Sequence, residues 1–314
     1  MKAARVRAAL AGDVADRPPF SLWYHFRHEP ETGEGFVRAT LDAYRAYDVD
    51  LLKVMHDVPY ELPIEKPVFT EPADWTMLPV NPPDAGGFGE QLRSLRQIRE
   101  YKNDDAPVID TIASVFAHGQ RITQGRLLEQ LDAEPDVVMA GLKRLAAALA
   151  GYAMATLENG GDGIFLAVAG ADAGTLAAER YVEQFLPLDQ LVLGSVAAGW
   201  CNVVHLHGDD LHFDALRPLT ERAHAVSWSD RAAGPSLSEA RARSVRCVVG
   251  GVDERRIAGY TPEQVRDEIA DAVAQTGGGR GLIVAPGCSV PTETPPANLR
   301  AFKEAVEAAR HTGS

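Results

Sequence analysis

The chain has 314 residues, of which 46% are hydrophobic and 24% are charged. This balance is typical of a globular protein and excludes a mainly disordered chain. The formal net charge of -13 disfavours nucleic acid as a partner, because an acidic surface repels phosphate backbones.

The three cysteines, Cys201, Cys247 and Cys288, are too few and too scattered to predict a disulfide framework. A reduced, cytoplasmic location is the simpler expectation. The first residues are charged and lack the apolar core of a signal peptide. We find no run of about 18 apolar residues, so we expect no membrane partner.

Short apolar runs alternate with amphipathic or alanine-rich segments along the chain. The runs lack a two-residue alternation, as expected of parallel strands buried on both faces. The predicted strands are 19–24, 50–55, 106–113, 163–169, 202–207, 223–229, 246–251 and 281–286. The predicted helices are 35–47, 90–101, 125–131, 136–159, 176–200, 214–222, 238–244, 261–276 and 295–310.

Strands that alternate with helices in this way predict an α/β fold, a single (β/α)8 TIM-type barrel domain over residues 1–314. The alternative is a doubly wound open sheet. That fold would need a glycine-rich fingerprint after the first strand, and residues 23–27 contain no glycine. The connection 59–105 carries seven prolines and is unusually long, so we expect an insertion that lies over the mouth of the barrel.

In such a barrel the chemistry is located where strands end. Most of the nine histidines fall at or near predicted strand ends, which favours a functional site over scattered surface positions. The candidate residues at these ends are His25, Arg27, His28, His56, Asp57, His205, His207, Trp228, Gly251 and Cys288.

His205 and His207 are two residues apart on one predicted strand, so both imidazoles face the same way. Cys288 follows the last predicted strand, across the rim. Two nitrogens, one thiolate and an open fourth position are typical of a catalytic zinc site. The alternative is two buried, hydrogen-bonded histidines and an unrelated buried cysteine.

The segment Gly281-Leu-Ile-Val-Ala-Pro-Gly-Cys288-Ser-Val-Pro, followed by Thr294-Pro-Pro-Ala-Asn-Leu299, resembles the C-terminal signature of the uroporphyrinogen decarboxylase superfamily. It is nearer to the zinc-dependent, cobalamin-linked methyltransferase branch. There His205 and Cys288 match zinc ligands, and His207 stands where that branch has a cysteine. Imidazole also ligates zinc, so the resemblance implies a zinc cofactor.

The resemblance further implies methyl transfer between a corrinoid and a thiol or similar small nucleophile, and it suggests a homodimer. Asp210-Leu-His212 begins like a corrinoid-binding motif, but Ala215 replaces its glycine. A corrinoid would therefore be carried by a partner protein.

The decarboxylase branch is the alternative, and it implies a porphyrinogen-type substrate and no cofactor. Asp57 matches the catalytic aspartate of that branch. Only Arg27 offers a guanidinium near the loop after the first predicted strand, although a polycarboxylated tetrapyrrole requires several. Cys288 also replaces the histidine that the branch has after its last strand.

We assign Asp57, His25 and Arg27 as catalytic residues and His28, His56, Trp228 and Gly251 as substrate contacts. Each has a plainer alternative. Asp57 is then a helix cap or a surface carboxylate, and the histidines are partly exposed loop residues. Trp228 packs at the barrel rim, and Gly251 forms a tight turn. A non-catalytic metal or tetrapyrrole binding protein, or a metal-assisted lyase or hydrolase, also stays open.

Overall fold

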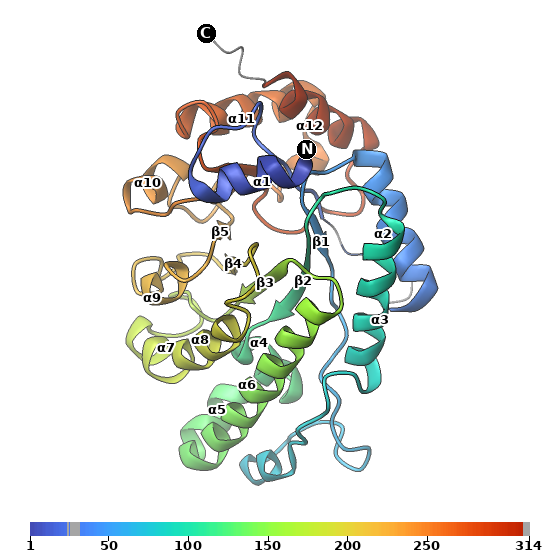
Figure 1. The fold of residues 1–314 in the computed structure, drawn as a ribbon. Helices are drawn as coiled ribbons and strands as arrows, with labels where there is room; N and C mark the ends of the chain where they lie inside the picture. The colour runs from blue at the N-terminus through green and yellow to red at the C-terminus, as the bar shows by residue number, and fades with distance from the viewer. Residues whose placement is uncertain (24, 26–31, 310–314) are drawn as a thin grey trace.

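The computed structural model describes residues 1–23, 25 and 32–309. Within these residues seven parallel strands form one sheet, in which each strand pairs with its neighbour in chain order. The helices surround the strands in Figure 1, as in barrel-type α/β folds. The strands are β1 (Leu52–Val54), β2 (Val108–Ala113), β3 (Gly163–Val168), β4 (Val203–Leu206), β5 (Ala225–Trp228), β6 (Val248–Val252) and β7 (Leu282–Pro286).

The helices lie between these strands and at both ends of the chain. The α-helices are α1 (Lys2–Ala11), α2 (Gly33–Tyr47), α3 (Gly86–Tyr101), α4 (Val115–Ile122), α5 (Leu127–Ala133), α6 (Pro135–Glu158), α7 (Ala178–Gln184), α8 (Leu186–Ser195), α9 (Arg217–Thr220), α10 (Leu237–Ala242), α11 (Pro262–Gln275) and α12 (Pro296–Ala308). Two short 3-10 helices are η1 (Pro72–Met77) and η2 (Ile257–Gly259).

The two edges of the sheet meet at Phe20. This residue forms an isolated parallel bridge with Val284 of β7. Its carbonyl accepts hydrogen bonds from the N–H groups of Asp50 and Leu51, which lie just before β1. The sheet is therefore curled, with residues around Phe20 between β7 and β1, and the fold is consistent with a TIM-like barrel.

The predicted first strand, 19–24, is wrong as a regular strand, because the structure reduces it to this bridge. Pro18 and Pro19 have no N–H to donate, which limits a ladder at its start. Tyr24 lies outside the described residues. The other predicted strands are confirmed, with ends that differ by up to two residues.

The helix predictions differ from the structure at three places. Helices α1 and α4 were not predicted, although Ser114 caps α4 by accepting the Ala117 N–H. The predicted helix 176–200 is two helices, α7 and α8, which are separated at Phe185; Pro187 lies in the first turn of α8, where proline is well tolerated.

The predicted insertion 59–105 contains η1 and α3. Helix α3 packs beside α2 in the outer layer, so the irregular part ends before Gly86. In η1, Trp75 is fully buried and its indole N–H donates to Gln130 of α5 at 2.8 Å. The contacts of η1 are thus with α5 and α6, and a position over the barrel mouth stays a prediction.

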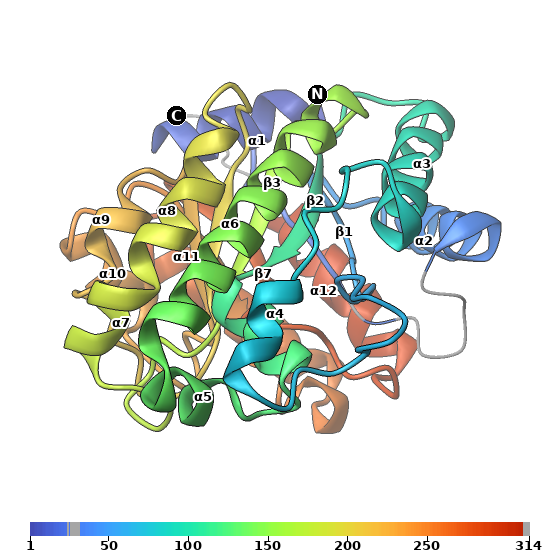
Figure 2. The same ribbon diagram turned by 90° about the horizontal axis from the view of Figure 1, so that it is seen from below.

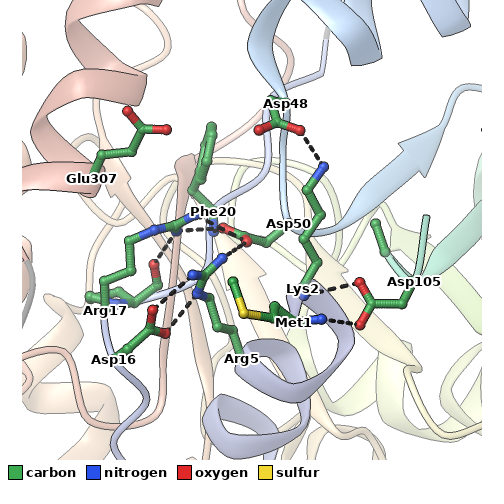
Figure 3. A network of polar contacts seen from close by, with 12 residues as sticks. Met1, Lys2, Arg5, Asp16, Arg17, Phe20, Asp48, Asp50, Asp105 and Glu307 are labelled. Carbon is green, nitrogen blue, oxygen red and sulfur yellow. Dashed lines mark hydrogen bonds and ion pairs between the residues drawn. The ribbon is translucent and has the colours of Figure 1, made fainter. Parts of the chain in front are cut away.

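A polar network ties the N-terminal segment to the residues that precede β1 (Figure 3). The fully buried Asp50 accepts from Arg17 at 2.6 and 3.2 Å and from Arg5 at 3.1 Å. Arg5 also binds Asp16 through two 2.7 Å bonds. Because this network lies at the amino ends of the strands, it stabilises the fold and is remote from the end that carries chemistry in barrels.

One helix of the described part of the chain, α6, is long and apolar enough to cross a membrane by length and composition. It packs against α8 and η1, and Figure 2 shows it beside α8. Just over half of its apolar stretch, 56%, is buried inside the protein. These contacts are those of a helix that covers the sheet.

Candidate metal centre

Three side chains of metal-ligand type converge at the carboxyl ends of β4 and β7. His205 lies on β4, His207 follows it directly, and Cys288 comes two residues after β7. Their ligand atoms all lie within 4.8 Å of one another. The backbone N–H of His207 donates to Val168 at 2.8 Å, which extends the pairing of β4 with β3 and keeps the two imidazoles on one face. We call these three residues the His-His-Cys cluster.

His205 is held in place by its neighbours on β3 and β5. Its Nδ1 lies 3.2 Å from the hydroxyl of Ser227, its register partner on β5. Its ring stacks on Phe165, with ring centroids 5.2 Å apart and planes at 23°. The other ring nitrogen, Nε2, is buried and has no hydrogen-bond partner among the described residues. A buried nitrogen without a partner is costly, so this atom is available to a ligand.

Cys288 is the third member of the cluster and is partly buried. Burial by itself raises the pKa of its thiol, but His205 and His207 outweigh this effect and lower the pKa to about 4. Its Sγ lies 3.8 Å from Nδ1 of His207, and this contact raises the pKa of His207. Cys288 is therefore a thiolate at neutral pH, which is the form that binds metals.

The cluster fits a zinc ion in donor type and in spacing. Bond lengths of about 2.3 Å to sulfur and 2.0–2.1 Å to nitrogen place tetrahedral sulfur and nitrogen ligands about 3.6 Å apart. The observed 3.8 Å between Cys288 and His207 is close to that value. Two imidazoles and one thiolate are donors that zinc accepts. The structure thus brings together the three residues that the sequence singled out, and metal binding itself stays a prediction.

A buried carboxylate that the sequence reasoning missed lies beside the cluster. Oε1 of Glu254 accepts a 2.6 Å hydrogen bond from Ser229, whereas Oε2 is buried without a partner among the described residues. A Cβ on Gly287 would lie 2.6 Å from Oε2 and 2.7 Å from the Ser229 Cα. Only glycine therefore lets the chain pass here into Cys288. A signal was present, since Glu254 closely follows the predicted strand 246–251.

Lys53 was also missed, although it interrupts the apolar run Leu51-Leu52-Lys53-Val54-Met55. It lies in β1 and is only 5% exposed. Its ammonium group sits 4.6 Å from the ring centroid of Phe165, the ring that stacks on His205. Burial lowers the pKa of Lys53 to about 8, and the negative charges of Cys288 and Asp57 oppose this shift.

Asp57 and His25, both predicted to be catalytic, form a pair. Oδ2 of Asp57 lies 2.6 Å from Nδ1 of His25, and both side chains are part-exposed. Burial raises the pKa of Asp57, but the hydrogen bond and charge of His25 and the charge of Lys53 give a net lowering. This pair can orient a substrate or hold a proton. Arg27, predicted to be catalytic, and His28, predicted to contact substrate, lie outside the described residues.

His56 is placed between the sheet and the helices. Its Nδ1 lies 3.1 Å from the carbonyl of Thr111, and its ring contacts Phe88 of α3 and Tyr152 of α6. Burial lowers its pKa, which favours the neutral ring. These are the contacts of a packed histidine, although its Nε2 is buried without a hydrogen-bond partner among the described residues, so a role in substrate binding stays a prediction.

Trp228 and Gly251 are likewise engaged within the protein. Trp228 has no exposed surface, packs against Phe213 and donates its indole N–H to Pro235 at 2.8 Å. Ser227 points toward His205, and successive strand residues point to opposite faces. Trp228 therefore points away from the cluster and cannot stack on a ligand there. The N–H of Gly251 donates to Asp230 at 2.9 Å, so it is not free for an anion, and its φ of 113° suits a turn.

A cavity of about 440 Å³ lies between α9 and α10 and extends to the amino ends of β5 and β6. It shares no lining residue with the His-His-Cys cluster. This cavity is therefore not the expected active site, because barrel enzymes carry their chemistry at the carboxyl ends of the strands.

Comparison with known proteins begins with a family model described as uroporphyrinogen decarboxylase (URO-D), which matches residues 1–309. The methylcobamide:CoM methyltransferase MtbA of Methanosarcina mazei is 25% identical over 73% of this chain and 66% of its own length, just under two thirds. A uroporphyrinogen decarboxylase of a Synechococcus strain is 22% identical over 96% of both chains. A uroporphyrinogen decarboxylase of Azotobacter vinelandii is 25% identical over 78% of this chain and 71% of its own.

Solved structures show the same fold. A methyltransferase from Methanosarcina mazei superposes with a TM-score of 0.80, at 16% identity, over 98% of both chains. A B12-independent methionine synthase from Shewanella sp. W3-18-1 gives a TM-score of 0.59, at 13% identity, over 93% of this chain and 94% of its own. At these identities the likeness concerns architecture alone.

Proposed function

The chain belongs to the uroporphyrinogen decarboxylase family, and we propose that within it the protein is a zinc-dependent methyltransferase. The methyl donor would be a corrinoid, and the acceptor a thiol or a similar small nucleophile. The observation that carries this proposal is the His-His-Cys cluster, with its unpartnered His205 Nε2 and its low-pKa thiol.

His205, His207 and Cys288 would hold the zinc ion and leave a fourth position open. When bound, zinc supplies a positive charge that lowers the pKa of a nucleophile at that position, so that an anion exists at neutral pH. Ser227 keeps Nδ1 of His205 occupied, which leaves Nε2 to the metal.

Two carboxylates, those of Glu254 and Asp57, would handle the substrate and its proton. Oε2 of Glu254 is unpartnered and would accept the proton that the thiol releases, while Ser229 fixes the carboxylate through Oε1. Asp57, held by His25, would orient the substrate from the end of β1. A corrinoid, when bound, would supply the methyl group that the nucleophile held at this site accepts.

The name of the relative MtbA, a methylcobamide:CoM methyltransferase, supports a corrinoid as methyl donor. We propose that the corrinoid arrives on a partner protein, because this chain lacks the glycine of the corrinoid-binding motif at Ala215. Residues 59–85 would form part of the docking surface if they face the mouth. A cytoplasmic location and a homodimer complete the proposal and are open to test by fractionation and by light scattering.

The proposal is tested by incubating the zinc-loaded protein with methylcobalamin and a panel of small thiols. Loss of the methylcobalamin absorbance, with one thioether formed per methyl group, is the expected result. The Cys288→Ala variant should be inactive, whereas Cys247→Ala, which removes a buried thiol outside the cluster, should be active. Equal activity of Cys288→Ala and wild type would contradict the proposal.

Porphyrinogen decarboxylation is the second candidate, and the Asp57–His25 pair favours it, as do the two decarboxylases among the relatives. It predicts release of carbon dioxide from uroporphyrinogen without added metal. That activity should be lost in Asp57→Asn and retained in Cys288→Ala. The two variants therefore separate the candidates by opposite outcomes.

A further inference from the structure

Lys53 occupies an unusual place for a lysine, inside the barrel below the His-His-Cys cluster. Its neighbour Val54 pairs with Asp110, whose carboxylate is bound by Gln91 of α3 and Tyr152 of α6 and thus faces the helices. Successive residues of a strand point to opposite faces, so Lys53 points into the barrel. The rings of Phe165 and Trp23 lie 4.6 and 5.5 Å from its ammonium group.

The ammonium group lacks a partner that matches its charge. Its hydrogen bond among the described residues goes to the thioether of Met55, at 2.8 Å, and it forms no ion pair within this part of the chain. A thioether is a weak acceptor, and the faces of two rings give only a partial substitute for water. A buried cation in this position is costly unless an anion joins it.

Lys53 lies close to the cluster that would bind the proposed nucleophile. Phe165 separates Lys53 from His205, since it stacks on the imidazole and lies under the ammonium group. The negative charges of Cys288, Asp57 and Asp110 act on Lys53 and each raises its pKa. A zinc ion would neutralise the Cys288 thiolate, which leaves Lys53 with still less compensating charge.

We propose that Lys53 is a specificity-determining residue that binds an anionic group, such as a carboxylate or sulfonate, on the small-molecule nucleophile. The metal would take the thiol end of that ligand, and Lys53 would take its acidic end. This inference deepens the proposed function and rests on it for the thiol end. The acidic end follows from the unpartnered ammonium group itself.

The test compares two thiols of equal length, the anionic 3-mercaptopropionate and the neutral 3-mercapto-1-propanol. Both are titrated calorimetrically into zinc-loaded wild type, Lys53→Met and Lys53→Arg. Methionine keeps the unbranched shape without the charge, and arginine keeps the charge. Wild type should bind the anionic thiol roughly 10- to 100-fold more tightly, as expected of a charge-assisted hydrogen bond. Lys53→Met should lose this preference, and Lys53→Arg should retain part of it.

Zinc content and the affinity for the neutral thiol should be the same in Lys53→Met and wild type. A preference that survives in Lys53→Met, or equal binding of both thiols by wild type, overturns the inference. So does a loss of zinc in Lys53→Met, which would mean that the ammonium group only balances the Cys288 thiolate. Thermal unfolding checks that each variant is folded.

Propionate serves as a third probe, because it carries the acidic group without the thiol. Weak binding of propionate that Lys53→Met abolishes places the anion site at Lys53 whether the anion is free or part of the ligand. If wild type takes up no zinc, the proposed function fails separately. The metal-free protein then still decides on Lys53, since binding of propionate must depend on that residue and its absence refutes the inference.

Discussion

Replacing Cys288 by alanine should remove most of the metal affinity of the protein. A structural zinc site with four protein ligands has about 10–16 kcal/mol of binding free energy, which is roughly 2.5–4 kcal/mol per ligand if shared equally. The loss of one ligand then weakens binding about 100- to 1000-fold. The low pKa of Cys288 makes this the full loss of a ligand, because no proton competes for the sulfur at pH 7.

The assay is zinc content by mass spectrometry after dialysis, followed by competition with a chromophoric chelator. Wild type should hold about one zinc per chain and Cys288→Ala far less. Cys247→Ala is the matched control, because burial raises the pKa of that thiol to about 12 and it lies outside the cluster. The reasoning is refuted if Cys288→Ala binds zinc as tightly as wild type, or if wild type binds none.

Three further predictions concern Ser227, the thiol of Cys288 and the buried carboxylate of Asp50. Ser227→Ala should weaken zinc binding about 10- to 100-fold in the chelator competition, because His205 loses the hydroxyl that orients its ring; an unchanged affinity would exclude this role. In the metal-free protein, iodoacetamide should modify Cys288 at a nearly constant rate between pH 6 and 8, since a thiol of pKa about 4 is already deprotonated there; a tenfold rise per pH unit would indicate an ordinary thiol. Asp50→Asn should lower the free energy of unfolding by about 3–5 kcal/mol in urea titrations, because it leaves the buried Arg17 unpaired, and it should not change zinc content; a loss under 1 kcal/mol would mean that water replaces the carboxylate.

Much of the fold was predictable because parallel strands buried on both faces leave a local signature. Short apolar runs such as 163–169 and 281–286 need only their own residues to be recognised. The first predicted strand failed because pairing there depends on how the edges of the curled sheet meet at Phe20, which no local pattern encodes. The prediction of one helix over 176–200 was wrong because local helix propensity does not show the break at Phe185 between α7 and α8.

The candidate site divides in the same way. His205, His207 and Cys288 could be named from the sequence, since strand alternation and strand ends bring such residues to one rim. Their convergence within 4.8 Å and the thiolate state of Cys288 follow only from the distances between side chains 81 or more residues apart.

Other residues changed place once the chain was folded. His56 and Trp228 were expected to face a ligand. His56, two residues after β1, contacts Tyr152 of α6, and Trp228 of β5 points to the face opposite Ser227, because one step along a strand reverses the face. Lys53 and Glu254 were not predicted, but Lys53 points into the barrel and Glu254 is buried beside Gly287, next to Cys288. The sequence determines which side chains are available near strand ends, whereas burial and charge pairing, which arise only in the tertiary structure, decide which of them meet.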